Sequence, residues 1–381
     1  MPRRPRVLLL AAANATSGGG EKHVADLLEL LPSAGIDVSL ACPPGGDLSA
    51  LAERLGIDVA PVEIASGFSA GKVRGVSRAI AEASPDVVHA HGSRAALFAR
   101  LADPRAAQRC VYTVHGIHAD KAGSLARRTV FLGLERFLCV RTAHFVTVCE
   151  SDIAKGARLG VLDVARASVV YNGIGAAPGD AVCGAFRAEL GLPAGAPLVL
   201  SVGRMHQQKD QATLLRAWRD VIAEHPGAVL ALVGSGELEG QLREVARAQG
   251  LGEAVRFVSP RQGLGPAYAD ADVFALSSLW EGLPYVVLEA MSFGLPVVST
   301  AVDGVPEAVV QGETGLLVPA SDAAALGRSL ATLLGDAELR RKMGEAGRDR
   351  VASRFSLDSM VTSLLGVYEG VAAGAATQPE Q

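Results

Sequence analysis

Aromatic residues and net charge are both scarce in this sequence, and each scarcity excludes a class of protein. Aromatic side chains make up only 4% of the 381 residues, so platforms for stacking nucleic-acid bases are few. The formal net charge is -4, which provides no general attraction to polyanions. We therefore expect no nucleic-acid partner.

Cysteine is also rare, and its arrangement excludes two further classes. The five cysteines are scattered, odd in number and never spaced as a Cys-x-x-Cys pair. A disulfide framework or a zinc site is not expected from this pattern. In apolar strands a cysteine acts as a small hydrophobic residue. This usage is typical of a reducing cytoplasm.

Long apolar runs are missing as well. No uncharged run reaches the roughly 18 residues that span a bilayer. Arg3, Arg4 and Arg6 precede a short apolar core, and residues 13–15 resemble a signal-peptidase site. Because a glycine run follows at once, we interpret this segment as a first buried strand with its loop. We expect a cytoplasmic protein, soluble or at the inner face of the cell membrane.

What the sequence has in quantity is a repeated alternation of strands and helices. Hydrophobic residues make up 49% of the chain, enough for large cores. Short, fully apolar strands that alternate with helices indicate parallel sheets covered on both faces. Strands are expected at residues 6–12, 36–41, 59–64, 86–90, 110–114, 145–149, 168–171, 198–202, 229–233, 255–258, 273–276, 296–300 and 315–318.

Glycine and proline punctuation divides this alternation into two domains. We expect an α/β fold of two Rossmann-like domains that face each other across a cleft. The first covers residues 1–178, a linker covers 179–196, and the second covers 197–355. A final helix at 356–373 is expected to return to the first domain. Ligands of such sheets bind beyond the carboxyl ends of the strands.

The most informative stretch runs from Glu281 to Met291. Its two acids, Glu281 and Glu289, lie eight residues apart around Pro284, which suits the first turn of a helix. Glu281 should then lie in the preceding loop and Glu289 inside the helix. The N–H groups of residues 285–287 would point out of the helix N-terminus and could bind an anion. The alternative is a buried helix with two incidental acids.

Cations and glycines follow the first two strands of the second domain. Arg204 and Lys209 come after the end of one strand and suit a diphosphate. The guanidinium of Arg204 can bind two oxygens at once, and the ammonium of Lys209 adds a point charge. Gly234 and Gly236 follow the next strand and allow close approach of a ligand. Surface charge and an ordinary loop are the alternatives.

The first domain offers a glycine loop and a group of histidines. Gly18, Gly19 and Gly20 follow the first strand, but His23 stands where the dinucleotide fingerprint needs its third glycine. A nicotinamide-dependent oxidoreductase is therefore the weaker alternative. His89 is expected to be a core residue. His91 and His115 fall at strand ends, where contact with a ligand is expected.

These motifs, taken in order, resemble the family 4 glycosyltransferases. The motifs are Gly19-Gly20-Glu21, Val88-His89-Ala90-His91-Gly92, Val146 to Ser151, Val170 to Ile174, Val202-Gly203-Arg204 with Lys209, Val233 to Gly236, Glu281 to Met291, Gly304 to Glu307 and Gly315 to Val318. The resemblance covers nearly the whole chain. It implies the two-domain GT-B fold and the transfer of a sugar from a nucleotide-sugar donor to a hydroxyl, with retention at the anomeric carbon.

The resemblance also implies roles for individual residues. Arg204 and Lys209 would clamp the donor diphosphate, Glu289 would bind the ribose, and Glu281 would face the donor sugar. The rest of the donor site would be Gly19, Gly20, Gly203, Gly234, Gly236, Val258, Gly282, Leu283, Pro284, Tyr285 and Val286. His115 matches the active-site histidine of the family, and His91 with His118 would lie on the acceptor side. No metal and no cofactor is expected.

The acceptor is the least specified part of the expectation. The stretch from Tyr112 to Phe137 is similar to members that build exopolysaccharide or O-antigen on lipid carriers. A UDP- or GDP-sugar and a lipid-linked acceptor are expected, with a soluble acceptor or an inverting reaction that uses His115 as base as alternatives. Weak contact with a membrane surface through Arg127, Arg128, Arg136 and Arg141 is a further hypothesis.

Overall fold

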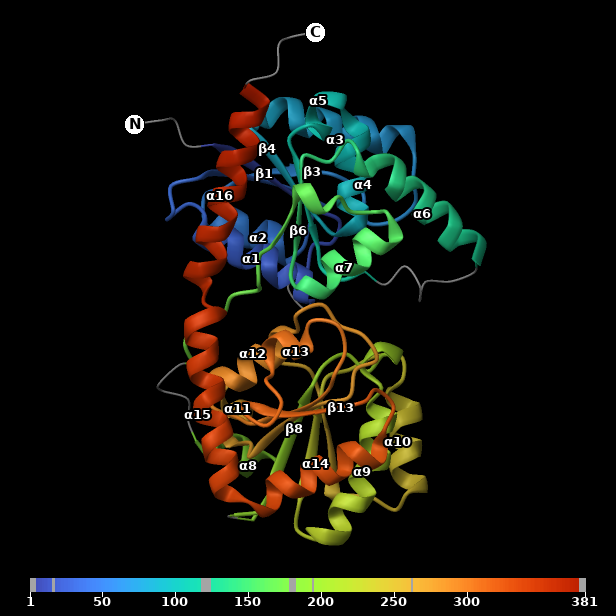
Figure 1. The fold of residues 1–381 in the computed structure, drawn as a ribbon, viewed down its shortest axis with the longest axis vertical. Coiled ribbons are helices and arrows are strands. Elements are labelled where there is room, and N and C mark those ends of the chain that lie inside the picture. The colour runs from blue at the N-terminus through green and yellow to red at the C-terminus, as the bar shows by residue number, and fades with distance from the viewer. Residues whose placement is uncertain are drawn as a thin grey trace. The chain divides into compact units, whose positions relative to one another are not determined.

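The structure is a computed structural model that describes residues 5–15, 18–117, 125–177, 183–193, 195–261 and 263–376. The chain divides into two compact units. Unit 1 consists of Met1–Asn172 with Leu357–Gln381, and unit 2 of Gly173–Ser356. Each unit is built on one parallel sheet with helices on both faces (Figure 1), as expected from the sequence.

Unit 1 holds a sheet of seven strands in the order β3-β2-β1-β4-β5-β6-β7. Its strands are β1 (Arg6–Ala11), β2 (Asp37–Cys42), β3 (Asp58–Pro61), β4 (Val87–His91), β5 (Cys110–Val114), β6 (His144–Thr147) and β7 (Ala167–Val169). Its helices are α1 (Gly19–Leu30), α2 (Asp47–Arg54), α3 (Ala70–Ala83), α4 (Gly92–Ala102), α5 (Pro104–Ala107), α6 (Leu125–Cys139), α7 (Glu150–Leu159) and α16 (Leu357–Ala376), with a 3₁₀ turn at Val164–Arg166.

Alternate residues of each strand supply two separate cores in unit 1. Val7 and Leu9 of β1 pack with α1, α2 and α16 on one face. Leu8 and Leu10 pack with α3, α4 and α6 on the other face. Because side chains alternate across a strand, a fully apolar strand such as β1 requires helices on both sides.

Unit 2 holds a sheet of six strands in the order β10-β9-β8-β11-β12-β13. Its strands are β8 (Leu198–Val202), β9 (Val229–Val233), β10 (Val255–Val258), β11 (Val273–Leu276), β12 (Val297–Thr300) and β13 (Gly315–Val318). Its helices are α8 (Ala185–Glu189), α9 (Gln211–Glu224), α10 (Glu239–Ala248), α11 (Gly265–Asp270), α12 (Tyr285–Ser292), α13 (Val305–Ala308), α14 (Ala323–Gly335) and α15 (Ala337–Arg354), with 3₁₀ turns at Gln207–Lys209 and Gly252–Ala254.

The helical stripe predicted after Lys209 forms the centre of the unit 2 core. Leu214, Leu215 and Trp218 of α9 are fully buried with α10 and α14 against one face of the sheet. The indole Nε1 of Trp218 donates to the carbonyl of Ala254 at 2.9 Å, so the largest core side chain leaves no polar atom unsatisfied.

The first unit boundary lies before the domain boundary expected at residue 178, whereas the second lies one residue from the expected start of the final helix at 356. Unit 2 begins at Gly173, and the described part of 179–196 includes α8, so this stretch is not a plain linker. The Asp270 carboxylate accepts hydrogen bonds from the N–H groups of Phe186 and Arg187 at 2.7 and 3.0 Å, which fixes α8 in unit 2. A carboxylate at a helix N-terminus is a favourable arrangement. The glycine and proline residues from which the linker was predicted do not reveal it.

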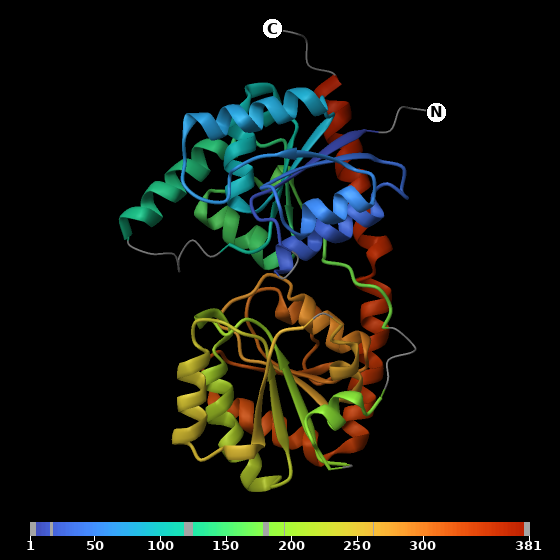
Figure 2. The same ribbon diagram turned by 180° about the vertical axis from the view of Figure 1, so that it is seen from behind.

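The last helix, α16, belongs to unit 1 and is the red helix that ends near the C-terminus in Figure 2. Its Leu364 and Tyr368 are buried in the core of this unit. The described helices include none that is long and apolar enough to cross a membrane.

Candidate active site

The loop between β11 and α12 places Glu281 at the carboxyl edge of the unit 2 sheet. Glu281 is 5% exposed and lies in the loop, and Glu289 lies inside α12, as predicted. Two details were wrong. Pro284 has extended backbone and precedes the helix instead of forming its first turn. The N–H of Val287 donates to the Pro284 carbonyl at 3.1 Å, so it is not available to an anion.

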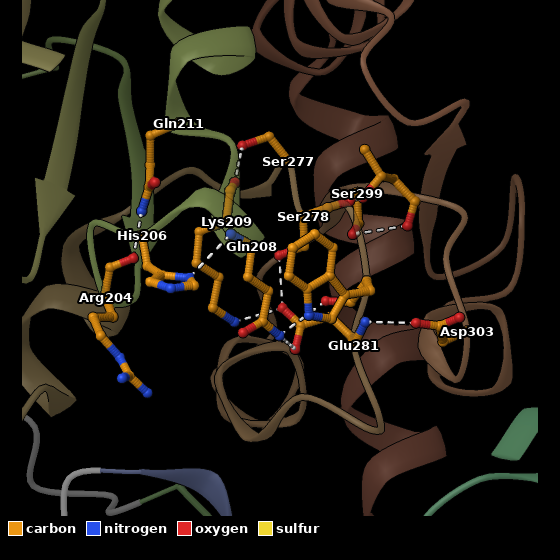
Figure 3. Close-up of polar contacts among 12 residues, drawn as sticks. Arg204, His206, Gln208, Lys209, Gln211, Ser277, Ser278, Glu281, Ser299 and Asp303 are labelled. Carbon is orange, nitrogen blue, oxygen red and sulfur yellow. Dashed lines mark hydrogen bonds and ion pairs between the residues drawn. The ribbon is translucent and has the colours of Figure 1, made fainter. Parts of the chain in front are cut away.

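Glu281 is surrounded by donors. The ammonium of Lys209 lies 2.5 Å from Oε1, and the hydroxyl of Ser278 donates to the same oxygen at 2.6 Å. The side-chain amide of Gln208 lies 3.4 Å from Oε2. The backbone N–H of Glu281 donates to Asp303 at 2.7 Å. Figure 3 shows Lys209, Gln208 and Ser278 converging on the Glu281 carboxylate, with Asp303 on the backbone side of the residue. The position of the Glu281 carboxylate is therefore fixed by contacts within unit 2.

Arg204 does not join this cluster. It follows β8, its side chain is exposed, and it extends away from the Lys209–Glu281 pair in Figure 3. Its backbone carbonyl accepts a hydrogen bond from Gln211 at 3.0 Å. The two cations expected to act together thus lie apart, Lys209 paired with an acid and Arg204 extended into solvent. An exposed guanidinium remains able to turn toward a ligand.

Close backbone packing explains the glycines at this edge. A Cβ on Gly234 would lie 2.1 Å from the carbonyl oxygen of Gly203, and its φ of +147 is also rare for other residues. A Cβ on Gly236 would lie 2.3 Å from the carbonyl oxygen of Met205. These glycines therefore let the loops after β8 and β9 touch each other, which is a structural reason that does not require a ligand.

Glu289 has one buried partner. The hydroxyl of Tyr268, from α11, donates to Oε2 at 2.8 Å. The Tyr268 ring stacks on Phe293 with centroids 5.5 Å apart. Burial and the neighbouring carboxylate raise the pKa of Tyr268 well above its usual value, so the hydroxyl keeps its proton and donates. Val258, which ends β10, accepts the N–H of Gly234 at 2.9 Å.

In unit 1, four histidines gather at the carboxyl edge of the sheet. They are His23 of α1, His89 and His91 of β4, and His115 after β5. His91 Nδ1 lies 3.4 Å from His115 Nε2, and the His23 and His115 rings are 5.2 Å apart. A Cβ on Gly20 would lie 3.2 Å from the His115 ring, which places the glycine loop against this imidazole. Gly19 opens α1 beside it.

All four imidazoles are held neutral. Burial lowers the pKa of His23 to about 4, against the opposing hydrogen bond from Asn172 and with a smaller contribution from Lys22. Burial lowers the pKa of His115 to about 3, and His23 adds to that effect. Burial likewise lowers the pKa of His89 and His91 well below the usual value. A neutral imidazole can accept or donate a hydrogen bond but carries no charge at neutral pH.

His89 is a core residue, as predicted. Its Nδ1 lies 2.7 Å from the hydroxyl of Tyr368, and its Nε2 lies 2.6 Å from that of Thr113. His91 and His115 lie at strand ends, as predicted, whereas His118 lies outside the described residues. Where the structure describes the chain, no group of three His, Cys, Asp or Glu residues is placed to hold a metal ion.

Sequence reasoning did not single out Gln208, Ser278, Asp303 or Tyr268. A signal existed for two of them. Ser278 closely follows buried strand β11 at the edge where ligands bind, and Asp303 precedes the Gly304-Val305-Pro306-Glu307 motif after β12. Tyr268 carried no signal, because a tyrosine in a short helix is usually a core residue.

Sequence comparisons identify the family. The family described as "Glycosyltransferase Family 4" matches residues 17–177, and "Glycosyl transferases group 1" matches residues 184–350. The lipopolysaccharide core biosynthesis glycosyltransferase LpsE of Rhizobium meliloti is 36% identical over 47% of this chain and 52% of its own length. The chain thus spans about half the length of several curated relatives it matches.

Other similarities extend over almost the whole chain. The UDP-Gal:alpha-D-GlcNAc-diphosphoundecaprenol alpha-1,3-galactosyltransferase of Escherichia coli is 25% identical over 89% of this chain and 90% of its own length. The crystal structure of Anabaena Alr3699/HepE with UDP and glucose is 22% identical and covers 96% of this chain and 100% of its own, with a TM-score of 0.84. The two family matches and the shared fold lead to one conclusion: this chain belongs to the family 4 glycosyltransferases of GT-B fold.

Proposed function

We propose that the protein is a retaining glycosyltransferase that moves a sugar from a UDP- or GDP-sugar to a hydroxyl acceptor without a metal ion. The acceptor we propose is a lipid-linked sugar or glycan of cell-surface polysaccharide synthesis, used on the cytoplasmic side of the membrane. Names of the relatives support this choice, since one is a lipopolysaccharide core enzyme and another takes a sugar diphosphoundecaprenol.

The observation that carries the proposal is the Lys209–Glu281 pair at the carboxyl edge of the unit 2 sheet. An ammonium there is held 2.5 Å from a buried carboxylate, beside the start of α12. Parallel sheets bind ligands at this edge. A donor diphosphate would meet Lys209 and Arg204, while the sugar hydroxyls would meet Glu281 and the ribose would meet Glu289.

The chemistry follows from these placements. As the bond between sugar and diphosphate breaks, negative charge grows on the departing phosphate, and Lys209 and Arg204 stabilise it. The phosphate oxygen that leaves takes the proton of the acceptor hydroxyl on the same face of the sugar. The balance is one C–O bond broken, one C–O bond formed and one proton moved to phosphate, so no separate base is required. His115 is assigned to the catalytic residues, and His91 and His118 are assigned to the acceptor side.

A thermal-shift screen with UDP, GDP, ADP and their sugars, in the presence of EDTA, tests the donor assignment. A ligand at 100 times its dissociation constant stabilises the folded state by about 2.7 kcal/mol. We expect a shift with UDP or GDP and their sugars. A shift that needs added magnesium would contradict the metal-free clamp, and no shift under either condition would contradict the donor site.

The stereochemistry needs its own measurement. Once the donor is known, NMR of the product reports whether the anomeric configuration of the donor sugar is kept. We expect retention. Inversion would contradict the proposed mechanism, because an inverting reaction needs a separate base such as His115.

A further inference from the structure

Helix α6 carries an exposed apolar stripe, which we call the α6 stripe. It consists of Ala126, Val130, Gly133, Phe137 and, just after the helix, Val140. The spacing of i, i+4, i+7, i+11 and i+14 keeps these residues on one face of a helix. Val130 is 70% exposed, Phe137 is 55% exposed and Val140 is 72% exposed.

The opposite face of α6 already faces the core of unit 1. Leu132, Leu138 and Cys139 are buried there, and Glu135 pairs with Arg100. The apolar residues of the α6 stripe are therefore not the ones that hold α6 in place. In Figures 1 and 2 the amino-terminal half of α6 extends beyond the other helices of unit 1. Exposed apolar stripes of this kind mark interaction sites.

Within residues 125–141 the exposed charges are of one sign. Residues 125–141 contain four arginines and a single acid, Glu135, whose side chain is 5% exposed because it is paired with Arg100. Arg136 is exposed on one side of the stripe. Arg141 lies on the other side, with its guanidinium 4.8 Å from the centre of the Phe137 ring. The sequence hypothesis placed these arginines in several directions, but the structure shows two of them bordering one apolar stripe.

The surface continues past the end of the helix. Arg166 donates to the carbonyls of Val140 and Thr142 at 3.3 and 2.6 Å, which holds the Val164–Arg166 turn beside the stripe. Val164 is 57% exposed. The acid of this turn, Asp163, is bonded to Arg166 at 2.9 Å, so its charge is compensated.

We propose that the α6 stripe, with Arg136 and Arg141, docks on the surface of an anionic lipid membrane. Such a surface offers an apolar layer for Val130, Phe137 and Val140 directly below phosphates that arginines bind. A second copy of this chain fits less well. Two α6 stripes packed face to face would bring the arginines of both copies together, and like charges oppose that contact.

Vesicle sedimentation tests the inference without a sugar donor, so its outcome is independent of the proposed reaction. The vesicles contain phosphatidylglycerol and phosphatidylcholine in equal amounts, with pure phosphatidylcholine as comparison. We expect the wild-type protein to sediment with the anionic vesicles at low salt and to be released at high salt.

Two variants with matched controls locate the contact. The double variant Val130→Ser, Phe137→Ser should bind about tenfold more weakly because it removes buried apolar area. Arg141→Gln should bind about fivefold more weakly because one arginine is lost at the surface. The controls are Phe68→Ser, which changes a phenylalanine that is 62% exposed elsewhere on unit 1, and Arg74→Gln on α3. Both controls should bind as the wild type does.

Several outcomes would overturn the proposal. These are absence of binding to anionic vesicles, equal binding to pure phosphatidylcholine, or an equal loss in the Phe68→Ser control. A wild-type protein that ignores vesicles but self-associates in ultracentrifugation, while Phe137→Ser stays monomeric, would assign the α6 stripe to a second copy instead. Circular dichroism of each variant confirms that it is folded.

Discussion

Glu281 and Glu289 are held by different donors, and this difference sets what each can do. Glu281 accepts hydrogen bonds from an ammonium and a hydroxyl, Lys209 and Ser278. Glu289 accepts from the single buried hydroxyl of Tyr268 at Oε2. Because Tyr268 fixes one oxygen of Glu289, the carboxylate presents the other in a defined direction. A fixed acceptor of this kind suits the ribose hydroxyls that we propose Glu289 binds.

Tyr268→Phe should therefore weaken donor binding with little effect on turnover. It removes the hydrogen bond that orients the Glu289 carboxylate, so the proposed bond from the donor ribose to Glu289, worth about 1.5–3 kcal/mol, should be weakened and the KM for the donor should rise by up to roughly tenfold. Initial-rate kinetics over donor concentration provide the measurement, and a thermal melt confirms that the unit 2 core is intact. An unchanged KM would contradict the positioning role.

The cations are tested separately from the acids. Arg204→Ala and Lys209→Met should each lower kcat by about 100-fold or more, because each removes a charge that we propose stabilises the departing diphosphate. Arg216→Ala, an exposed arginine on α9, serves as the control and should keep wild-type kcat. Unchanged turnover in Arg204→Ala would exclude this residue from the clamp. This residue matters most for the test, since its side chain lies apart from Glu281 in the structure.

At the scale of elements, α4 and α6 are joined by a buried ion pair. Arg100 of α4 has a fully buried side chain and binds both oxygens of Glu135 at 2.9 and 3.0 Å. Its guanidinium also lies 5.1 Å from the centre of the Tyr112 ring on β5. The pair fixes the rotation of α6 about its axis, and so determines that the α6 stripe faces outward.

Removing one partner should destabilise unit 1 more than removing both. Glu135→Leu or Arg100→Leu alone leaves a buried charge unpaired, at a cost of about 3–5 kcal/mol. The double variant leaves no such charge, so its loss should be clearly smaller than the sum of the two. Urea unfolding of the wild type and the three variants measures this coupling. Additive losses would show that the pair contributes nothing beyond the separate side chains.

At the scale of the whole molecule, the histidine cluster makes the stability of unit 1 depend on pH. The folded-state pKa of each of the four histidines is lowered below the unfolded value, to about 4 for His23 and about 3 for His115. Below pH 6.5 the histidines of the unfolded chain therefore bind protons, whereas the same histidines in the folded chain stay unprotonated. Stability is fully present above pH 6.5 and is lost as the pH falls toward 4 and 3.

His91→Asn should flatten this dependence. Each proton that only the unfolded state binds contributes a slope of about 1.4 kcal/mol per pH unit. The variant removes one such site. Between pH 6.5 and 4, the slope of its unfolding free energy against pH should therefore be smaller than that of the wild type by the contribution of about one proton. Urea titrations at several pH values compare the two proteins, and identical slopes would contradict a role of His91 in the acid sensitivity.

The sequence by itself determined the fold and the edge of each sheet at which chemistry is placed. Fully apolar strands require helices on both faces, and every motif after a strand must lie at the carboxyl edge of a parallel sheet. Strands such as Cys110–Val114 and Val229–Val233 were predicted residue for residue for this reason. The predicted linker differed from the structure because a long-range contact decides where unit 2 begins. Asp270 binds the start of α8 from 84 residues away.

Only the tertiary structure decided which side chains meet. Lys209 contacts Glu281 across 72 residues, Tyr268 contacts Glu289 from another helix, and His89 meets Tyr368 across 279 residues. No local sequence pattern predicts these contacts, because they depend on how strands are ordered in a sheet and how helices are rotated above it. The same holds for the α6 stripe: its spacing is present in the sequence, but its exposure follows from the burial of Glu135 against Arg100 on the opposite face.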